Sequence, residues 1–283
     1  MDIGLLKTFL EVNRTRHFGQ AADNLFLTQS AVSARIRLLE QTVGVSLFIR
    51  TRNHIELTPA GKKLLKYADS ILNTWNRARQ DIAIEENEQI PLAIGGVPSL
   101  WDILLQDWLN TLASTDSALS IHAEVHSPEV LVRRLIDGTL DVAFMFESLQ
   151  MTELVTENVG NINLVMASSV AKMTAEDAVA MHNYIYVDWG TSFSITHAQH
   201  FPNIPPPRFH LQLGRMALDM LLSGGGTAYL AESMVKNELE NGRLYMVEDA
   251  PVIKRMCYAA YAPTSDRRDI IKQAIEPILN RTL

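Results

Sequence analysis

Gln29, Ser30 and Ser33 lie near the start of the stretch LTQSAVSARIRLLEQTVG, and two arginines, Arg35 and Arg37, follow them. Hydroxyl and amide groups of this size can form hydrogen bonds with the edges of nucleotide bases, and arginines can bind phosphates. This chemistry needs the small side chains on one face of a helix and an apolar face opposite them. The neighbouring elements decide whether that arrangement is present.

The apolar residues of this stretch recur at helical spacing, which predicts a helix from Thr28, as N-cap, to about Val43, with Gly44 ending it. Its buried stripe is predicted to be Val32, Ile36 and Leu39, and its outward face Ser30, Ser33, Ala34 and Arg37. An ordinary solvated face would more often carry Glu and Lys. The small polar face therefore favours a helix that lies in the major groove of DNA. The candidate contacts on it are Thr28, Gln29, Ser30, Ser33, Arg35 and Arg37.

The elements on either side predict a winged helix-turn-helix. Helices are expected near Ile3–Arg14 and Gly19–Leu25, and a hairpin follows with strands over residues 47–50 and 55–57. The tip of this hairpin is basic, and a basic wing beside such a helix can contact the backbone or the minor groove. The candidate wing contacts are Arg50, Arg52 and His54.

A long helix is predicted from Thr58, as cap, and Pro59, as first residue, to about Glu86. Apolar residues recur along it every three or four positions, which is typical of a coiled-coil seam. We expect the seam to pair with the same helix of a second subunit. The alternative is packing against the next domain of the same chain. The seam residues are Leu64, Ala68, Ile71, Trp75, Ala78 and Ile82.

Charge is divided unevenly along the 283 residues, whose net charge is −7. Residues 1–80 hold 12 basic and 6 acidic side chains, whereas the remainder holds 13 and 26, so the two parts carry +6 and −13. A basic part in an acidic chain indicates nucleic-acid contact. Cys257 is the single cysteine, which excludes an internal disulfide. With no recognisable leader and no run of about 20 apolar residues, we expect a cytoplasmic protein without membrane contact.

The segment LLKTFLEVNRTRHFGQAADNLFLTQSAVSARIRLLEQTVGVSLFIRTRNHIELTPAGKKLL resembles the winged helix-turn-helix of LysR-type transcriptional regulators. The resemblance implies a double-stranded DNA operator, a dimer or tetramer formed through the linker helix, an effector-sensing C-terminal domain and contact with RNA polymerase. Two positions depart from the family pattern. Ser30 stands where proline is frequent, and Ala34 where a basic or polar residue is frequent. The wing glycine is also absent around Asn53 and His54.

Strands and helices alternate after the linker, which predicts an α/β domain with a mostly parallel sheet. The family resemblance implies two lobes of periplasmic-binding-protein type, with crossings near Asn161–Asn163 and near Ala262–Pro263. The predicted domains are the winged helix-turn-helix (1–58), the linker helix (59–88) and the effector domain (89–283). Within the last, lobe I is expected over about 89–161 and 264–283, and lobe II over about 162–263.

Ligands of open α/β sheets bind beyond the carboxyl ends of strands, where helix N-termini offer free N–H groups. By this rule and by family position, Ser99 is the leading effector contact, with a plain helix N-cap as its alternative. No Arg or Lys is aimed at an anion by the sequence, so a weakly polar or neutral ligand, or none, is expected. The candidate effector residues are Val97, Pro98, Ser99, Leu100, Trp189, Gly190, Thr191, Leu213 and Gly214.

Enzyme and metal motifs are missing from the sequence. It contains no GxSxG, HExxH or CxxC pattern, and His197 and His200 have no third ligand nearby. Cys257, within an apolar strand, is expected to be inert. We therefore predict a regulator without cofactor or catalysis that binds inverted-repeat operators. The alternatives are a cytoplasmic small-molecule-binding protein and a hydrolase with an accessory helical domain.

Overall fold

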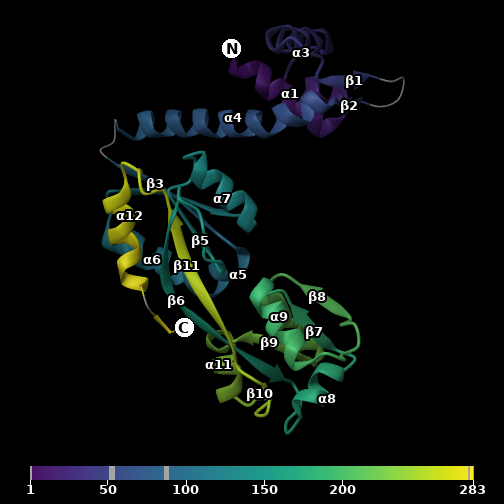
Figure 1. Cartoon of the computed structure of the whole chain (residues 1–283), viewed down its shortest axis with the longest axis vertical. Helices are drawn as coiled ribbons and strands as arrows, with labels where there is room; N and C mark the ends of the chain where they lie inside the picture. The colour runs from purple at the N-terminus through teal and green to yellow at the C-terminus, as the bar shows by residue number, and fades with distance from the viewer. Residues whose placement is uncertain (1, 51–54, 86–88, 280, 283) are drawn as a thin grey trace. The chain divides into compact units, whose positions relative to one another are not determined.

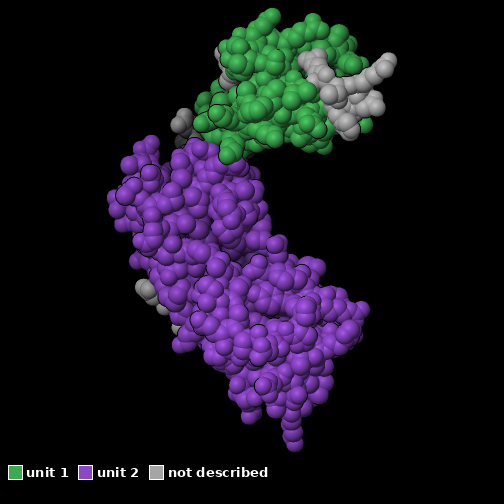
Figure 2. Space-filling view, turned by 45° about the vertical axis from the view of Figure 1, so that its right-hand side comes forward, with its two compact units in different colours: residues 1–87 green, residues 88–283 purple. Residues whose placement is uncertain are grey.

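The computed structural model describes residues 2–50, 55–85, 89–279 and 281–282 of the chain. It divides into two compact units, residues 1–87 and residues 88–283, which Figure 2 shows in separate colours. The long helix after the predicted wing belongs to the first unit. No helix within the described ranges combines the length and the apolar character that a membrane span needs.

Unit 1 is a helical domain with a small hairpin, followed by a long helix (Figure 1). Its elements are α1 (Ile3–Thr15), α2 (Phe18–Asn24), α3 (Gln29–Val43), β1 (Phe48–Arg50), β2 (Ile55–Leu57) and α4 (Pro59–Glu85). Side chains of α1, α2, α3, the hairpin and the start of α4 share one apolar core. The predicted winged helix-turn-helix is confirmed in its described part. The predicted wing tip, residues 51–54, lies outside the described residues.

Local sequence signals set the ends of α3 and α4. The hydroxyl of Thr28 accepts a hydrogen bond from Ala31 N at 3.2 Å, and Gly44 ends the helix with a left-handed φ of 78°. Similarly, the hydroxyl of Thr58 accepts from Gly61 N at 3.0 Å at the start of α4. A hydroxyl at the N-cap satisfies an amide that has no partner inside the helix. The predicted cap residues are thus confirmed for both helices.

Unit 2 has two α/β lobes. Lobe I consists of β3 (Ile90–Gly96), α5 (Pro98–Leu100), a π-helical turn (Trp101–Leu105), α6 (Gln106–Thr115), β4 (Leu119–Val125), α7 (Pro128–Ile136), β5 (Val142–Met145), α12 (Arg268–Ile275) and a 3₁₀ turn (Glu276–Ile278). Lobe II consists of α8 (Ala175–Ala180), β7 (Tyr184–Val187), α9 (Thr191–His200), β8 (Phe209–Leu211), α10 (Gly214–Gly224), β9 (Thr227–Ala231), α11 (Glu232–Glu240) and β10 (Tyr245–Met246).

Two long strands run from one lobe into the other, as Figure 1 shows. They are β6 (Val155–Ser168) and β11 (Ile253–Tyr261), which pair antiparallel along their length. The short β12 (Arg281–Thr282) joins β6 in parallel. Among the described residues, the sheet runs in the order β4-β3-β5-β11-β6-β9-β7-β8. The sheet is therefore continuous through both lobes.

The pairing corrects two predictions. Parallel pairs occur within the lobes, β3 with β4 and β5, and β7 with β8 and β9, but the centre of the sheet is antiparallel. The expectation of a mostly parallel sheet was therefore wrong for these central strands, although the named pairs within each lobe are parallel as predicted. In addition, residues 258–261 of β11 already pair with β5 of lobe I. The second crossing thus precedes the predicted position at Ala262–Pro263, because one strand carries the chain across without a break.

Candidate nucleic-acid interface and interlobe cleft

The position of α3 in unit 1 is fixed by its buried stripe. Val32, Ile36 and Leu39 have no exposed surface and lie in the core shared with α1 and α2. Burial of three branched side chains of this kind contributes several kcal/mol and prevents the helix from rotating about its axis. The opposite face must therefore point away from the unit.

That opposite face is small and polar at its N-terminal end. Gln29, Ser30, Ala34 and Arg37 are exposed, and Ser33 is half-buried. The hydroxyls of Thr28 and Ser30 lie 2.9 Å apart, so the first turn presents two linked hydroxyl groups. A surface without bulky side chains can approach base edges closely, while an arginine two turns along can bind a phosphate. The structure thus brings these predicted contacts together on one face.

The side chain of Arg35 points toward α1, unlike the other predicted DNA contacts on α3. It is half-buried, and its guanidinium Nη1 donates to the hydroxyl of Thr8 in α1 at 3.4 Å. Thr8 itself has no exposed surface. In this arrangement Arg35 packs beside α1 and is not extended from the α3 face. Of the predicted wing residues, Arg50 ends β1, whereas Arg52 and His54 lie outside the described residues.

The apolar seam of α4 has two parts with different neighbours. Leu64 packs against the core of unit 1, and Ala68 is fully buried in it. These two positions stabilise the fold of the unit itself, which corrects the prediction for Ala68 because it has no surface left for a second subunit. Ile71, Trp75 and Ile82 are instead 37%, 46% and 66% exposed, and Ala78 is half-buried. Within the described part of α4, the exposed apolar stripe thus begins after the first three turns.

Ser99 stands where the two lobes of unit 2 meet, but it is not a helix cap. The N-cap of α5 is Val97, which offers no side-chain hydrogen bond, and Pro98 follows it. The Ser99 hydroxyl donates to the backbone carbonyl of Gln212 at 3.2 Å, and Ser99 is only 4% exposed. The prediction of a capping role was therefore wrong. Ser99 belongs to lobe I and Gln212 follows β8 of lobe II, so this bond links the two lobes.

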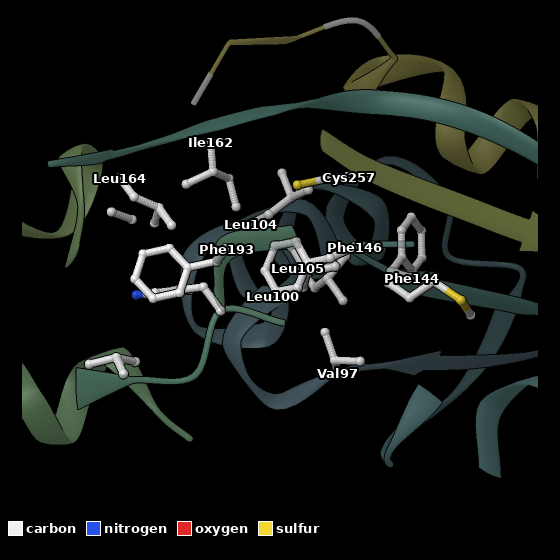
Figure 3. Close-up of a cluster of buried hydrophobic side chains, with 14 of the residues drawn as sticks. Val97, Leu100, Leu104, Leu105, Phe144, Phe146, Ile162, Leu164, Phe193 and Cys257 are labelled. Atoms are coloured by element: carbon white, nitrogen blue, oxygen red, sulfur yellow. The ribbon is translucent and has the colours of Figure 1, made fainter. Parts of the chain in front are cut away.

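Several predicted effector residues are part of the core and are not exposed to a ligand. Leu100 and Trp189 have no exposed surface, and the indole of Trp189 donates to the carbonyl of Tyr229 at 2.9 Å. Val97 is 6% exposed, and Gly214 is buried beneath the ring of Trp189. Figure 3 shows Val97 and Leu100 of lobe I gathered with Phe193 of lobe II in one apolar cluster. Pro98, Gly190 and Leu213 are half-buried, and Thr191 is exposed.

A buried cation, which the sequence pattern did not single out, lies where the two lobes meet. Arg255 on β11 is 4% exposed, its Nε donates to the carbonyl of Trp189 at 2.9 Å, and its Nη2 lies 3.1 Å from Glu147 Oε1. The guanidinium also lies over the ring of Phe146, 5.1 Å from its centroid. Phe146 and Glu147 follow β5 of lobe I, whereas Trp189 follows β7 of lobe II. Arg255 therefore joins both lobes.

Two further features fit this arrangement. Gly190 has a φ of +88°, which favours glycine, and a Cβ there would lie 2.8 Å from Glu147 Oε1 and 2.9 Å from Arg255 Nη2, so a larger residue would have to displace the ion pair. The strand period of two could have indicated Arg255, because it places this residue on the buried face with Ile253 and Cys257. A second ion pair, Arg215 Nε to Asp102 Oδ1 at 3.6 Å, links α10 of lobe II to the π-helical turn of lobe I.

The histidine and cysteine candidates are both accounted for by the core. Nε2 of His197 lies 2.6 Å from the hydroxyl of Tyr184, and burial, with His200 nearby as a smaller cause, lowers the His197 pKa to about 4. Cys257 is buried, which raises the pKa of its thiol to about 12. A thiol that stays protonated is a poor nucleophile and metal ligand. The described residues hold no cluster of three or more metal-ligating side chains.

The fold and the α3 face together define a DNA-binding transcriptional regulator with a winged helix-turn-helix and an effector-binding domain. The sequence profile described as "Bacterial regulatory helix-turn-helix protein, lysR family" matches residues 3–62, and that of "LysR substrate binding domain" matches residues 86–281. The chain belongs to the LysR family of transcriptional regulators, as its resemblance indicated.

Known relatives and structures agree with this membership. The chain is 36% identical to the HTH-type transcriptional regulator HdfR of Yersinia enterocolitica, over 99% of this chain and 97% of the relative. It has the same identity and coverage with HdfR of Yersinia pestis (strain Pestoides F). The fold is similar to that of full-length CbnR complexed with its target DNA, with a TM-score of 0.76, 18% identity, and 98% and 99% of the two chains covered. These homologous HdfR proteins are transcriptional regulators.

Proposed function

We propose that this regulator contacts DNA bases with the first turns of α3. The observation that carries the proposal is the outward face of that helix, where the small polar side chains of Gln29 and Ser30 are exposed and Ser33 is half-buried. In this proposal Gln29 and Ser33 contact base edges in the major groove, and Ser30 and Thr28 assist from the same turn. Arg37 and the wing residues Arg50, Arg52 and His54 bind phosphates. The chain acts as a regulator and not as an enzyme.

We further propose a homodimer, or a tetramer made of two such dimers, formed through α4. The exposed stripe of Ile71, Trp75 and Ile82 has the heptad-like spacing of a helix that pairs with its own copy. A two-fold dimer requires two inverted half-sites separated by whole turns of DNA. The structure of CbnR with its target DNA supports a double-stranded operator as the partner. Contact with RNA polymerase then links binding to transcription.

For the effector domain, we propose that a small molecule controls closure of the cleft at Ser99. In the structure the Ser99 hydroxyl donates a hydrogen bond to the Gln212 carbonyl. The guanidinium of Arg255 donates to the Trp189 carbonyl and to the Glu147 carboxylate. A ligand that accepts or replaces these bonds changes the relative stability of the closed and open lobes. Only such a difference in affinity between the two states can shift their equilibrium.

The test uses the full chain and a duplex that the wild-type protein enriches from a random-sequence pool. Ser33→Ala or Gln29→Ala is expected to relax base preference at one position, at a cost of about 1–3 kcal/mol. Arg37→Ala is expected to weaken all duplexes alike and to reduce the salt slope by about 1. Matched controls are Ser70→Ala, another half-buried helical serine, and Lys236→Ala, another exposed cation. Unchanged base preference in both Ser33→Ala and Gln29→Ala would refute the assignment of α3.

A further inference from the structure

Phe26 is the most exposed large apolar residue of the described chain, with 96% of its surface accessible. It lies in the turn between α2 and α3, and it is two residues before the N-cap of α3. Scattered exposed apolar residues are common on proteins, but most keep part of the side chain against a neighbour. The ring of Phe26 has no such support, so its position needs another explanation.

The backbone at Phe26 is also unfavourable for this residue type. Its φ is +54°, in the left-handed region that a helix end normally fills with glycine or asparagine. The turn is fixed on both sides, because Phe26 N donates to Asp23 O at 3.2 Å and Leu27 N donates to Ala22 O at 2.9 Å. Leu27 then packs against the core of unit 1. The ring is thus held outward by a well-anchored turn.

Two separate costs therefore meet at one residue, and the fold of unit 1 gains nothing from either. Asparagine would fit the left-handed backbone and would be better hydrated. Strained backbone of this kind is found preferentially at functional sites. Phe26 is next to the first turn of α3, where Gln29 and Ser30 are exposed. A partner for the ring should accordingly be the molecule that this turn contacts.

We infer that Phe26 contacts the 5-methyl group of a thymine in the major groove, next to the bases that α3 contacts in each half-site. This inference rests on the proposed role of α3 in DNA binding. A phenyl ring has no hydrogen-bonding group, and among the base edges in the major groove it is the thymine methyl that offers an apolar surface. The hydrogen bonds of the turn fix the backbone beneath the ring, so binding has to order only the side chain of Phe26. It therefore adds specificity for thymine at a position outside the polar contacts of Ser33.

The experiment measures binding of the full chain to the duplex enriched by the wild-type protein, with each thymine replaced in turn by deoxyuridine. For the wild type, loss of a single contacted methyl group, in one half-site, is expected to weaken binding roughly fourfold. Phe26→Ala should weaken binding to the thymine duplex about tenfold for each half-site contacted, which corresponds to the lower range for burying a Phe side chain. In Phe26→Ala the deoxyuridine substitution at that position should have no further effect. Tyr245→Ala, which removes a 39% exposed aromatic ring in unit 2, is the matched control.

Phe26→Asn provides a second, independent measurement. This variant should melt at a higher temperature than the wild type, since asparagine tolerates the left-handed backbone, and yet it should bind the thymine duplex as weakly as Phe26→Ala. A more stable protein that binds DNA less well cannot be explained by misfolding. Such a result would support a role in contact with DNA.

Three results would overturn the inference. In the first, Phe26→Ala keeps the wild-type affinity and the wild-type response to deoxyuridine. In the second, affinity falls for every duplex without coupling to a thymine, which would place the ring against sugar and phosphate. In the third, sedimentation shows a changed oligomer while DNA binding is intact, which would place the ring in a protein interface. Ser33→Ala distinguishes these three results from failure of the proposed DNA-binding role of α3. If that role is right, Ser33→Ala changes base preference whether or not Phe26 contacts a thymine.

Discussion

The guanidinium Nη2 of Arg255 lies 3.1 Å from Oε1 of Glu147, and this ion pair joins the strand that crosses between the lobes to the loop after β5. The two side chains differ in exposure, 4% for Arg255 and 40% for Glu147. Glu147 can therefore be hydrated without its partner, whereas Arg255 cannot. In this arrangement of the two lobes, the buried cation has an anion beside it.

Glu147→Ala should destabilise the effector domain, since it leaves the Arg255 charge buried without a carboxylate. Breaking a fully buried pair costs about 3–5 kcal/mol, and the exposure of Glu147 reduces this to roughly 2 kcal/mol. Glu147→Gln should cost less because it keeps an oxygen acceptor. Urea unfolding followed by tryptophan fluorescence measures both, with the exposed Glu153→Ala as control. Equal unfolding midpoints for Glu147→Ala and the wild type would show that the pair is not stabilising.

Ser99→Ala removes the hydrogen bond to the Gln212 carbonyl and should lower the free energy of unfolding by about 1 kcal/mol. We expect operator affinity in the absence of effector to stay close to wild type, because α3, the helix proposed to contact DNA, belongs to the other unit. The response to effector should be lost. Ser99→Thr keeps the hydroxyl and serves as the conservative comparison. Reporter output across growth conditions, at equal protein levels, measures the response. Identical responses of Ser99→Ala and wild type in all conditions would leave Ser99 with a structural role only.

Local features of the fold could be predicted from the sequence. The start and end of α3 follow from Thr28 and Gly44, and its buried stripe follows from the spacing of Val32, Ile36 and Leu39. Each of these depends on contacts within a few residues or on the period of one helix. The antiparallel pairing of β6 with β11 joins residues about 90 positions apart, such as Leu164 with Ile253. Strand order of this kind depends on tertiary packing and is not contained in local periodicity.

The candidate site shows the same division. The position of Ser99 beyond a strand end was predictable, but its partner Gln212 lies in the other lobe, 113 residues away. The burial of Arg255 is difficult to predict from the sequence, because a charged residue in an apolar strand ordinarily faces solvent. Only the fold shows that Glu147, Phe146 and the Trp189 carbonyl converge on it. The left-handed backbone of Phe26 is likewise invisible in a sequence in which neither glycine nor asparagine marks the turn.

The exposed stripe of α4 leads to a prediction about assembly. Trp75→Glu should place a charge in the proposed apolar contact between two α4 helices and should yield monomers with weak DNA binding. Thr74→Glu adds the same charge at an exposed neighbouring position of the same helix and should leave the dimer intact. Sedimentation velocity over a range of concentrations separates the two outcomes. A Trp75→Glu protein that still sediments as a dimer would place the subunit contact elsewhere.

His197 should make the stability of the protein depend on pH in the acidic range. Its ring is 3% exposed, packs among Tyr184, Phe193 and Tyr229, and accepts a hydrogen bond from the Tyr184 hydroxyl at 2.6 Å when neutral. Burial is the main cause that lowers its pKa from 6.5 to about 4, and the charge of His200 adds to it. Because the pKa in the folded state is below that in the unfolded state, the unfolded chain binds the proton first as the pH falls.

The stabilising contribution of neutral His197 is therefore complete above pH 6.5 and is lost as the pH falls toward about 4. The full loss corresponds to roughly 3 kcal/mol, at 1.36 kcal/mol for each pKa unit. His197→Phe should be less stable than wild type at pH 8, since the buried Tyr184 hydroxyl loses its partner, but its stability should fall less between pH 6.5 and 4. Tyr184→Phe is the control that removes the same hydrogen bond and keeps the titrating ring. Urea unfolding at a series of pH values gives both slopes. If wild type and His197→Phe lose stability in parallel over this range, the acid sensitivity arises from other groups. The next residue to replace is then the half-buried His126, because burial lowers its pKa as well.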